Sequence, residues 1–304
     1  MFRTSCLVAA LVSAGFSISF AQDGSGLLVV AHGAGPEWNT SVRATVSQVS
    51  WPHGPVEVAF LMGPEAESSG WDSAAARLAR SGVTRVVVVP LMVSSFGGHY
   101  RQVEHYAGVR AEMPAELGRH GHHAQPLPVP AVVTRALDDA SEIGAAIVER
   151  WQRLSERERS RPVLLVGHGP NDEADAERWT QNLAVHGERL RAAGLSRDFR
   201  VALLRDDAPA EIKSVAIAAM RDTLGALASR HGDSVLVMPI MIANGPIPQR
   251  GIPTHLAGLP WTAAPAGLTP HPAIARWIER VAAEGRCRGS GAGCRVGDPV
   301  YQRE

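Results

Sequence analysis

Short, almost uninterrupted runs of Val, Leu and Ile set the strongest limit on how this chain can fold. They include GLLVVAHG, VEVAFLMG and RVVVVPLMV in the first half, and PVLLVGHG, VALLRD and SVLVMPIMI in the second half. A strand that is apolar on both faces must be covered on both faces, as in a parallel sheet flanked by helices. These runs therefore predict buried parallel strands.

The stretches between these runs carry a helical pattern. WDSAAARLARSG and EIKSVAIAAMRDTLGALASRHG place apolar residues at the spacing of one helix face and end on glycine, which favours a helix C-terminus. A further helix, around 136–154, is expected to close the first half. Strands that alternate with helices are typical of an α/β architecture, and we predict parallel sheets flanked by helices.

The order of the motifs in the first half is repeated in the second half. His-Gly at 32–33 matches His-Gly at 168–169, VEVAFLMGP matches VALLRDDAP, and VVVVPLMVSSFGGH matches VLVMPIMIANGPIP. Self-similarity of this kind indicates two copies of one unit, and 304 residues exceed the usual size of one domain. We predict an N-terminal domain over 22–157, a C-terminal domain over 158–284 and a flexible tail over 285–304.

Residues 1–21 have the features of a secretory signal peptide. One arginine precedes an apolar run, and Ser19-Phe20-Ala21 provides a small-residue cleavage site before Gln22. The run is too short for a membrane span, so an uncleaved anchor is the less favoured interpretation. We therefore expect an exported, periplasmic protein that begins at Gln22 and has no transmembrane span after cleavage.

The cysteines agree with export. Cys6 lies within the predicted signal peptide, and the Gly-rich spacer of CRGSGAGC allows Cys287 and Cys294 to meet. In an oxidising compartment, such a pair favours a disulfide over a metal site.

The charge balance points to a small-molecule partner. The 30 basic and 30 acidic side chains give a formal net charge of zero. A chain without excess positive charge offers no electrostatic footprint for nucleic acid or for an anionic membrane. We therefore expect a small molecule, and no nucleic acid, as the partner.

Two histidines follow predicted strands at the edge where α/β sheets bind ligands. His32 ends the first apolar run, and His99 follows the Gly-rich stretch after another run of the same half. Ligands bind beyond the carboxyl ends of parallel strands, and imidazoles both bind Co, Ni, Fe or Zn and accept protons. One such histidine would most simply end a strand, but two in the same half favour a functional site.

These motifs resemble those of a known family. LLVVAHGAGPEWN, VEVAFLMGPEAES and GVTRVVVVPLMVSSFGGH, followed by RGIPTHLAGL and GLTPHPAIARWI, are similar to the class II tetrapyrrole chelatases. The resemblance is greatest to the CbiX-type sirohydrochlorin cobaltochelatases and their ferrochelatase relatives, and it spans about 26–280 in tandem. It implies a flavodoxin-like sheet in each half and a cleft that takes sirohydrochlorin.

The resemblance also implies a reaction and the residues that perform it. Members of this family insert a divalent metal ion into the tetrapyrrole without ATP or another nucleotide. Two histidines at matching positions hold the metal and help to remove the two pyrrole protons, and these roles carry over onto His32 and His99. The implied metal is Co²⁺, with Ni²⁺ and Fe²⁺ as alternatives.

Two positions depart from the family pattern. Many relatives carry Glu after AFL, where this chain has Met62, with Glu65 and Glu67 nearby. In the second half His168 is retained, but the counterpart of the Gly-rich histidine falls at Pro248. We therefore expect one metal site, in the first half.

Export leaves other functions open, because the known chemistry of this family serves cytoplasmic biosynthesis. A periplasmic carrier of metal or tetrapyrrole on the same fold is supported by Met62 and by the signal peptide. A relative retained without an active site is disfavoured by the paired histidines. The sequence alone does not choose between the enzyme and the carrier.

Three other motifs are weaker evidence of function. RHGHHA places His120, His122 and His123 in a predicted loop, which fits metal capture and a solvated loop equally well. RHG also occurs in histidine phosphatases, but neither copy in this chain follows a predicted strand. AHGAG is similar to the oxyanion loop of esterases, but the chain has no G-x-S-x-G nucleophile elbow.

Overall fold

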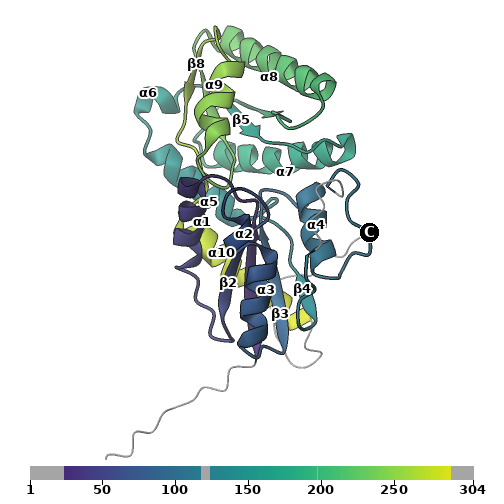
Figure 1. Cartoon of the computed structure of the whole chain (residues 1–304). Coiled ribbons are helices and arrows are strands. Elements are labelled where there is room, and N and C mark those ends of the chain that lie inside the picture. Colours follow the sequence, from purple (N-terminus) through teal and green to yellow (C-terminus); the bar gives the residue numbers. More distant parts are fainter. Residues whose placement is uncertain (1–23, 118–123, 197, 289–304) are drawn as a thin grey trace, which may run out of the picture.

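The computed structural model describes residues 24–117, 124–196 and 198–288, which form two α/β halves stacked end to end (Figure 1). The first half contains β1 (Ser25–Ala31), α1 (Pro36–Val46), β2 (Val56–Phe60), α2 (Ala66–Ser69), α3 (Trp71–Arg80), β3 (Arg85–Leu91), α4 (Gly98–Tyr106), β4 (Ala131–Val133) and α5 (Ser141–Gln152). The second half contains α6 (Glu156–Arg159), β5 (Val163–Gly167), α7 (Glu173–Ala192), β6 (Phe199–Leu203), α8 (Ala210–His231), β7 (Val235–Pro239), the π-helix η2 (Ile247–Gly251), α9 (Ile252–His255), β8 (Trp261–Ala263) and α10 (Pro272–Arg288).

Each half is built on one parallel sheet of four strands. The strand orders are β2-β1-β3-β4 and β6-β5-β7-β8, so the elements occupy equivalent places in the two halves. Every residue of β1 and of β5 is buried, as continuous apolar runs require. The predicted fold class, two α/β units with parallel sheets flanked by helices, is confirmed.

The central strands hold the sheets in a fixed register. Val29 of β1 pairs with Val58 on one side and Val89 on the other. Leu165 of β5 is placed in the same way, between Val201 and Met238. Because all these pairings are parallel, the carboxyl ends of the strands in each half lie at one edge of its sheet.

The last helix of the chain packs on the first sheet. In Figure 1 the yellow α10 lies among the purple and blue elements of the first half, and it contacts α1, β1, β3 and β4. Gly285 allows the close approach, because a Cβ there would lie 3.0 Å from methyl carbons of Val87 and Thr134. A flexible tail was expected from residue 285, but the helix continues to Arg288. The carbonyl of Arg286 accepts a hydrogen bond from the Arg85 side chain, which holds this end of the helix against β3.

The helix that ends the first half lies against the second half. We expected a helix around 136–154 to close the first half, and α5 forms there, but it contacts α7 and α10. Arg150 of α5 also donates to the carbonyl oxygens of Pro239 and Pro265. The helix was correctly expected, but helical spacing shows which residues are buried and not which other helices they contact.

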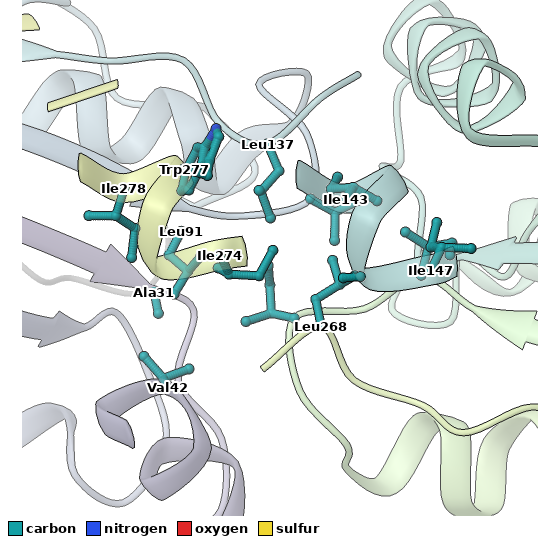
Figure 2. Packing of buried hydrophobic residues seen from close by; sticks show 14 of the residues in the cluster. Ala31, Val42, Leu91, Leu137, Ile143, Ile147, Leu268, Ile274, Trp277 and Ile278 are labelled. Carbon is teal, nitrogen blue, oxygen red and sulfur yellow. The ribbon is translucent and has the colours of Figure 1, made fainter. Parts of the chain in front are cut away.

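These helices form one hydrophobic core shared by both halves (Figure 2). Ile143 and Ile147 of α5 meet Leu268, and Ile274 and Trp277 of α10 join the same cluster. Burial of such side chains contributes about 1.5–3 kcal/mol each. The two halves are therefore expected to unfold together.

Several sequence predictions fall outside the described residues. They are the signal peptide (1–21), the histidine-rich loop (His120, His122 and His123) and Cys294. Cys287, near the end of α10, is disulfide-bonded. Within the described ranges, no helix is long and apolar enough to cross a bilayer.

Candidate functional site

The structure brings the two predicted site histidines together. His32 directly follows β1, and His99 is the second residue of α4, which begins after the loop that leaves β3. Their ring centroids lie 4.7 Å apart, and the ring planes are nearly perpendicular at 87°. The pair meets because β1 and β3 are neighbouring parallel strands whose carboxyl ends share one edge.

Each of these rings is held by its Nδ1 atom. Nδ1 of His32 lies 2.8 Å from the carbonyl oxygen of Gly33, and Nδ1 of His99 lies 3.0 Å from Oε1 of Gln102. The Gln102 amide is oriented by its own donation to the Tyr106 hydroxyl at 3.0 Å. Since both oxygens only accept, each Nδ1 carries the hydrogen and each neutral ring keeps its lone pair on Nε2. This is the tautomer that binds a metal ion through Nε2.

Burial keeps both rings neutral. Burial, together with the neighbouring His99, lowers the pKa of His32 from 6.5 to about 4. Burial also lowers the pKa of His99, although the hydrogen bond to Gln102 opposes this effect. A neutral imidazole binds a metal ion without first losing a proton, so this pair is ready to bind near pH 7.

A tight turn fixes the position of His32. Gly33 has φ +86°, and a Cβ at this residue would clash with the carbonyl oxygen of Met62. The turn is closed by a hydrogen bond from the Met62 amide to the His32 carbonyl and by one from the Ala34 amide to Asn39. Only glycine satisfies both the left-handed conformation and the close approach.

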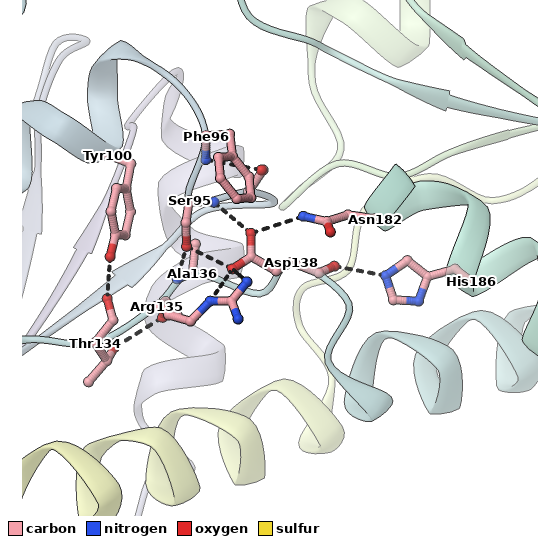
Figure 3. Close-up of polar contacts among 10 residues, drawn as sticks. Ser95, Phe96, Tyr100, Thr134, Arg135, Ala136, Asp138, Asn182 and His186 are labelled. Atoms are coloured by element: carbon pink, nitrogen blue, oxygen red, sulfur yellow. Dashed lines mark hydrogen bonds and ion pairs between the residues drawn. The ribbon is translucent and has the colours of Figure 1, made fainter. Parts of the chain in front are cut away.

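The loop that leads to His99 is anchored by Asp138 (Figure 3). The buried Asp138 carboxylate accepts hydrogen bonds from the amide and the hydroxyl of Ser95, both at 2.7 Å, and from Arg135 at 3.0 Å. Asn182 of α7 donates to the same carboxylate, and His186 donates to the Asp138 carbonyl. Burial raises the pKa of Asp138, and the donors from Ser95 and Arg135 oppose this rise.

The helix that carries His99 is clamped to the second half. Arg101 of α4 makes two hydrogen bonds of 2.7 and 2.6 Å to the buried carboxylate of Asp175 on α7. Trp179 of α7 donates to the Phe96 carbonyl in the loop before α4. A planar guanidinium that binds a carboxylate through two bonds fixes orientation as well as distance. The geometry at His99 is therefore coupled to the second half.

His168 reproduces the arrangement of His32 at the end of β5. Its Nδ1 lies 2.9 Å from the Gly169 carbonyl oxygen, and its Nε2 lies 3.9 Å from Oδ1 of Asp207. The charge of His168 lowers the pKa of His32 and of His99, and the charge of Asp207 raises both. His168 and Asp207 thus act electrostatically on both first-half histidines.

The second half does not repeat the paired histidines. Pro248, the sequence counterpart of His99, lies in the π-helix η2. Among the residues that the structure describes, no three or more His, Cys, Asp or Glu side chains form a ready-made cation cluster. The described part of the site thus offers two imidazoles, and a metal ion held there would need further ligands.

The acidic residues near Met62 do not complete the site. Glu65 accepts a hydrogen bond of 2.8 Å from Arg43 in an ion pair, and Glu67 lies in the first turn of α2. The Met62 side chain itself is exposed. Glu65 is therefore engaged by Arg43, and Met62 supplies no carboxylate at the position where the family resemblance leads one to expect glutamate.

Sequence reasoning missed another carboxylate beside His99. Glu116 packs so close to the start of α4 that a Cβ on Gly98 would lie 2.6 Å from its Oε1 atom. Its charge raises the pKa of His99. Glu116 lies in a segment rich in Pro and Gly, where no helical or strand pattern indicates which side chains approach the site.

The histidine pair lies within the part of the chain that matches a known family model. The CbiX model matches residues 26–154, which include both His32 and His99. This chain carries a CbiX-family domain. Its first half is therefore of the class II chelatase type, as the sequence motifs predicted. A search of the curated proteins finds no match.

Solved structures extend the likeness in fold from the CbiX-family half to nearly the whole chain. SirB from Bacillus subtilis with Fe³⁺ has a TM-score of 0.58 at 16% identity, covering 88% of this chain and 97% of SirB. The sirohydrochlorin chelatase SirB from Bacillus subtilis subspecies spizizenii with cobalt gives 0.58 at 15% identity, with the same coverage. A multi-domain protein from Deinococcus radiodurans with structural similarity to chelatases gives 0.52 at 18% identity, covering 88% of this chain and 56% of that protein. At these identities, the likeness establishes the shared fold.

The chemistry available at the CbiX-family half follows from its donors. Two neutral imidazoles with free Nε2 atoms bind divalent first-row metals. The same atoms accept protons when no metal occupies them. His32 and His99 thus have the chemistry both to bind a metal ion and to accept protons.

Proposed function

We propose that this protein is a sirohydrochlorin-type chelatase that inserts a divalent metal ion, cobalt first among the candidates, into a tetrapyrrole. His32 and His99 hold the metal and accept protons. The observation that carries the proposal is the neutral histidine pair, 4.7 Å apart with both Nε2 atoms free, inside a CbiX-family domain.

The reaction requires the protein to exchange a metal ion for two protons. The hydrogen bonds of Nδ1 fix each ring, so the Nε2 atoms of His32 and His99 bind the ion, which is a substrate. As the ion passes to the macrocycle, two pyrrole N–H bonds break and four metal–nitrogen bonds form, two at the deprotonated nitrogens and two at the imine-type nitrogens. Each released imidazole is then free to accept a proton, and the low pKa of His32 favours its onward transfer to water.

The place of action follows from the predicted signal peptide. We propose that the chain is exported and works in the periplasm. The disulfide at Cys287 supports this location, because disulfides persist in oxidising compartments. Mass spectrometry of the protein from a periplasmic fraction tests the location, and the expected N-terminal residue is Gln22.

A carrier on the same fold is the second candidate function. It is favoured by Met62, which supplies no carboxylate where family resemblance leads one to expect glutamate. A carrier needs affinity for a metal or a tetrapyrrole but no proton transfer. It would bind its cargo stoichiometrically and leave the rate of insertion unchanged.

An insertion assay separates the enzyme from the carrier. The mature chain is mixed anaerobically with sirohydrochlorin and Co²⁺, Ni²⁺ or Fe²⁺, and the absorbance change of the macrocycle is followed. Insertion faster than the spontaneous rate, lost in His32→Ala and in His99→Ala, is the expected result. His105→Ala, on α4 but bonded to the Arg110 carbonyl, is the matched control and is expected to retain the wild-type rate. Binding without acceleration would instead establish the carrier.

A further inference from the structure

Proton acceptance at the histidine pair raises a difficulty that the rest of the site must solve. Nδ1 of His32 already donates to the Gly33 carbonyl, and Nδ1 of His99 already donates to Gln102. Each ring therefore has one free nitrogen, and this is the atom that would hold the metal ion. While the ion occupies these atoms, the first pyrrole proton needs another acceptor.

We propose that His168, supported by Asp207, is the acceptor of that first proton. The inference rests on the proposed chelatase function and assigns a catalytic base to the second half of the chain. It goes beyond the first-half pair, because it requires both halves to face one substrate.

His168 is held in the same way as His32, through its Nδ1 atom, but it has no second histidine beside it in its own half. Nδ1 of His168 donates to the Gly169 carbonyl at 2.9 Å, so the lone pair lies on Nε2. Gly169 has φ +80°, and a Cβ there would lie 2.9 Å from the Leu203 Cβ. Because Pro248 occupies the place of a second histidine, Nε2 of His168 stays available for a proton.

Asp207 is placed to stabilise the imidazolium that would form. Its Oδ1 lies 3.9 Å from Nε2 of His168, within ion-pair distance once the ring is charged. Its side chain is 59% exposed, so the proton can pass on to water. The neighbouring Asp206 has a different role, because it is already paired with Lys213 at 2.6 Å and with His255 at 3.2 Å.

The two halves hold His168 opposite the metal-binding pair. Gly97, two residues before His99, approaches Pro170, two residues after His168: a Cβ on Gly97 would lie 3.8 Å from the Pro170 Cβ. The Arg101–Asp175 clamp fixes the helices on either side of this contact. The charges of His168 and Asp207 act on both first-half rings, which agrees with this placement.

The step balances in protons and electron pairs. One pyrrole N–H bond breaks, the proton passes to Nε2 of His168, and the nitrogen lone pair forms the first bond to the metal. The metal then leaves one imidazole, which accepts the second proton as the second metal–nitrogen bond forms. His168 returns its proton to water past Asp207, and the first-half imidazole returns the second proton to water, so two protons are released for each ion inserted.

The test compares insertion with metal affinity in the full mature chain. His168→Ala is expected to lower the rate of insertion at saturating substrates by about 100-fold, the lower range for general base catalysis. Added imidazole is expected to restore part of this rate. The Co²⁺ dissociation constant, measured by calorimetry without tetrapyrrole, is expected to change by less than about twofold, because His168 does not hold the ion in this account. This unchanged affinity also reports that the variant is folded.

Asp207→Asn tests the supporting carboxylate. Loss of its charge is expected to lower the insertion rate by about tenfold, and Co²⁺ affinity is expected to stay at the wild-type value. Asp206→Asn and His231→Ala are the matched controls in the same half, and both are expected to keep the wild-type rate and affinity.

Two outcomes overturn the inference, and a third overturns the function on which it rests. A wild-type rate in His168→Ala would show that the proton leaves by another path. A parallel loss of Co²⁺ affinity, tenfold or more, would make His168 a ligand and not a base. If the wild-type protein itself does not accelerate insertion, the chelatase proposal fails and this inference fails with it.

Discussion

Asp138→Asn tests how the structure holds the loop that leads to His99. Asp138 has φ +43°, a left-handed conformation that asparagine also adopts readily, so the backbone should be preserved. The substitution replaces one carboxylate oxygen by an amide nitrogen, which cannot accept a hydrogen bond. If the remaining oxygen keeps the bonds from the Ser95 amide and Asn182, the bond from Arg135 is lost.

The expected loss of stability follows from these contacts. A hydrogen bond to a charged group contributes about 1.5–3 kcal/mol, and the lost bond from Arg135 is of this kind. The Arg135 side chain is 39% exposed, so water replaces part of that contribution. The Ser95 hydroxyl can turn and accept from the new amide. We therefore expect the free energy of unfolding to fall by about 2 kcal/mol, toward the middle of that range.

Urea denaturation followed by circular dichroism measures this change. The midpoint is expected to fall at an unchanged slope, which shows that stability and not compactness has changed. Co²⁺ affinity is expected to weaken by about tenfold, as for other changes to residues that position metal ligands. Asp139→Asn removes the same charge one residue further along and is the control. A midpoint shift worth less than about 0.5 kcal/mol, the usual effect of a neutral surface change, would show that the Asp138 carboxylate does not stabilise this loop.

Three further perturbations test other parts of the structure. A double-mutant cycle of Arg101→Gln and Asp175→Asn is expected to give a coupling energy of about 0.5–3 kcal/mol in urea denaturation, because the two side chains contact each other directly. Trp277→Ala is expected to lower the free energy of unfolding by about 3–5 kcal/mol, and thermal unfolding should remain a single transition because both halves share this core. The buried His186 has its pKa lowered to about 4, so the unfolded chain binds more protons than the folded chain between about pH 6.5 and pH 4. His186 should therefore lower the free energy of unfolding as the pH falls through that window, by about 3 kcal/mol in all. His186→Gln should make the free energy of unfolding less dependent on pH in the same window.

Each of these expectations has a contradicting result. A zero coupling energy would show that the clamp between α4 and α7 adds nothing to stability. Two separate thermal transitions in the Trp277 variant would show that the halves have independent cores. An equal pH dependence in wild type and the His186 variant would assign the acid sensitivity to other groups.

The strands could be predicted from the sequence because residues that are buried on both faces of a sheet form a continuous apolar run. β1 and β5 are covered on both faces, so their runs of Val and Leu have no polar positions. The meeting of His32 and His99 followed from the same reasoning, because both come after strands of one parallel sheet. Local pattern and sheet geometry were sufficient for this part of the site.

The contacts between the halves could not be predicted in this way. The Arg101–Asp175 clamp joins residues far apart in the sequence, and nothing in either local pattern identifies the partner. Asp138 gave no signal for the same reason, since its donors come from separate segments. The helix around 136–154 was correctly expected, but its contacts with α7 and α10 depend on segments far away in the sequence and could not be predicted.

The second-half histidine shows a different limit of sequence reasoning. His168 lacks a paired histidine because Pro248 occupies the matching position, so the sequence favoured a single site in the first half. In the structure, Pro170, two residues after His168, approaches Gly97, two residues before His99. A residue that has no partner within its own half can still serve a site that both halves form.

We propose that His32 and His99 jointly hold one metal ion through their Nε2 atoms. This can be examined in a crystal structure of the mature protein with Co²⁺, with the ion located by its anomalous scattering. We expect one cobalt ion bound to both Nε2 atoms at about 2.1 Å, with each Nδ1 still donating to Gly33 or Gln102. A cobalt ion bound elsewhere, or bound by only one of the two rings, would contradict it.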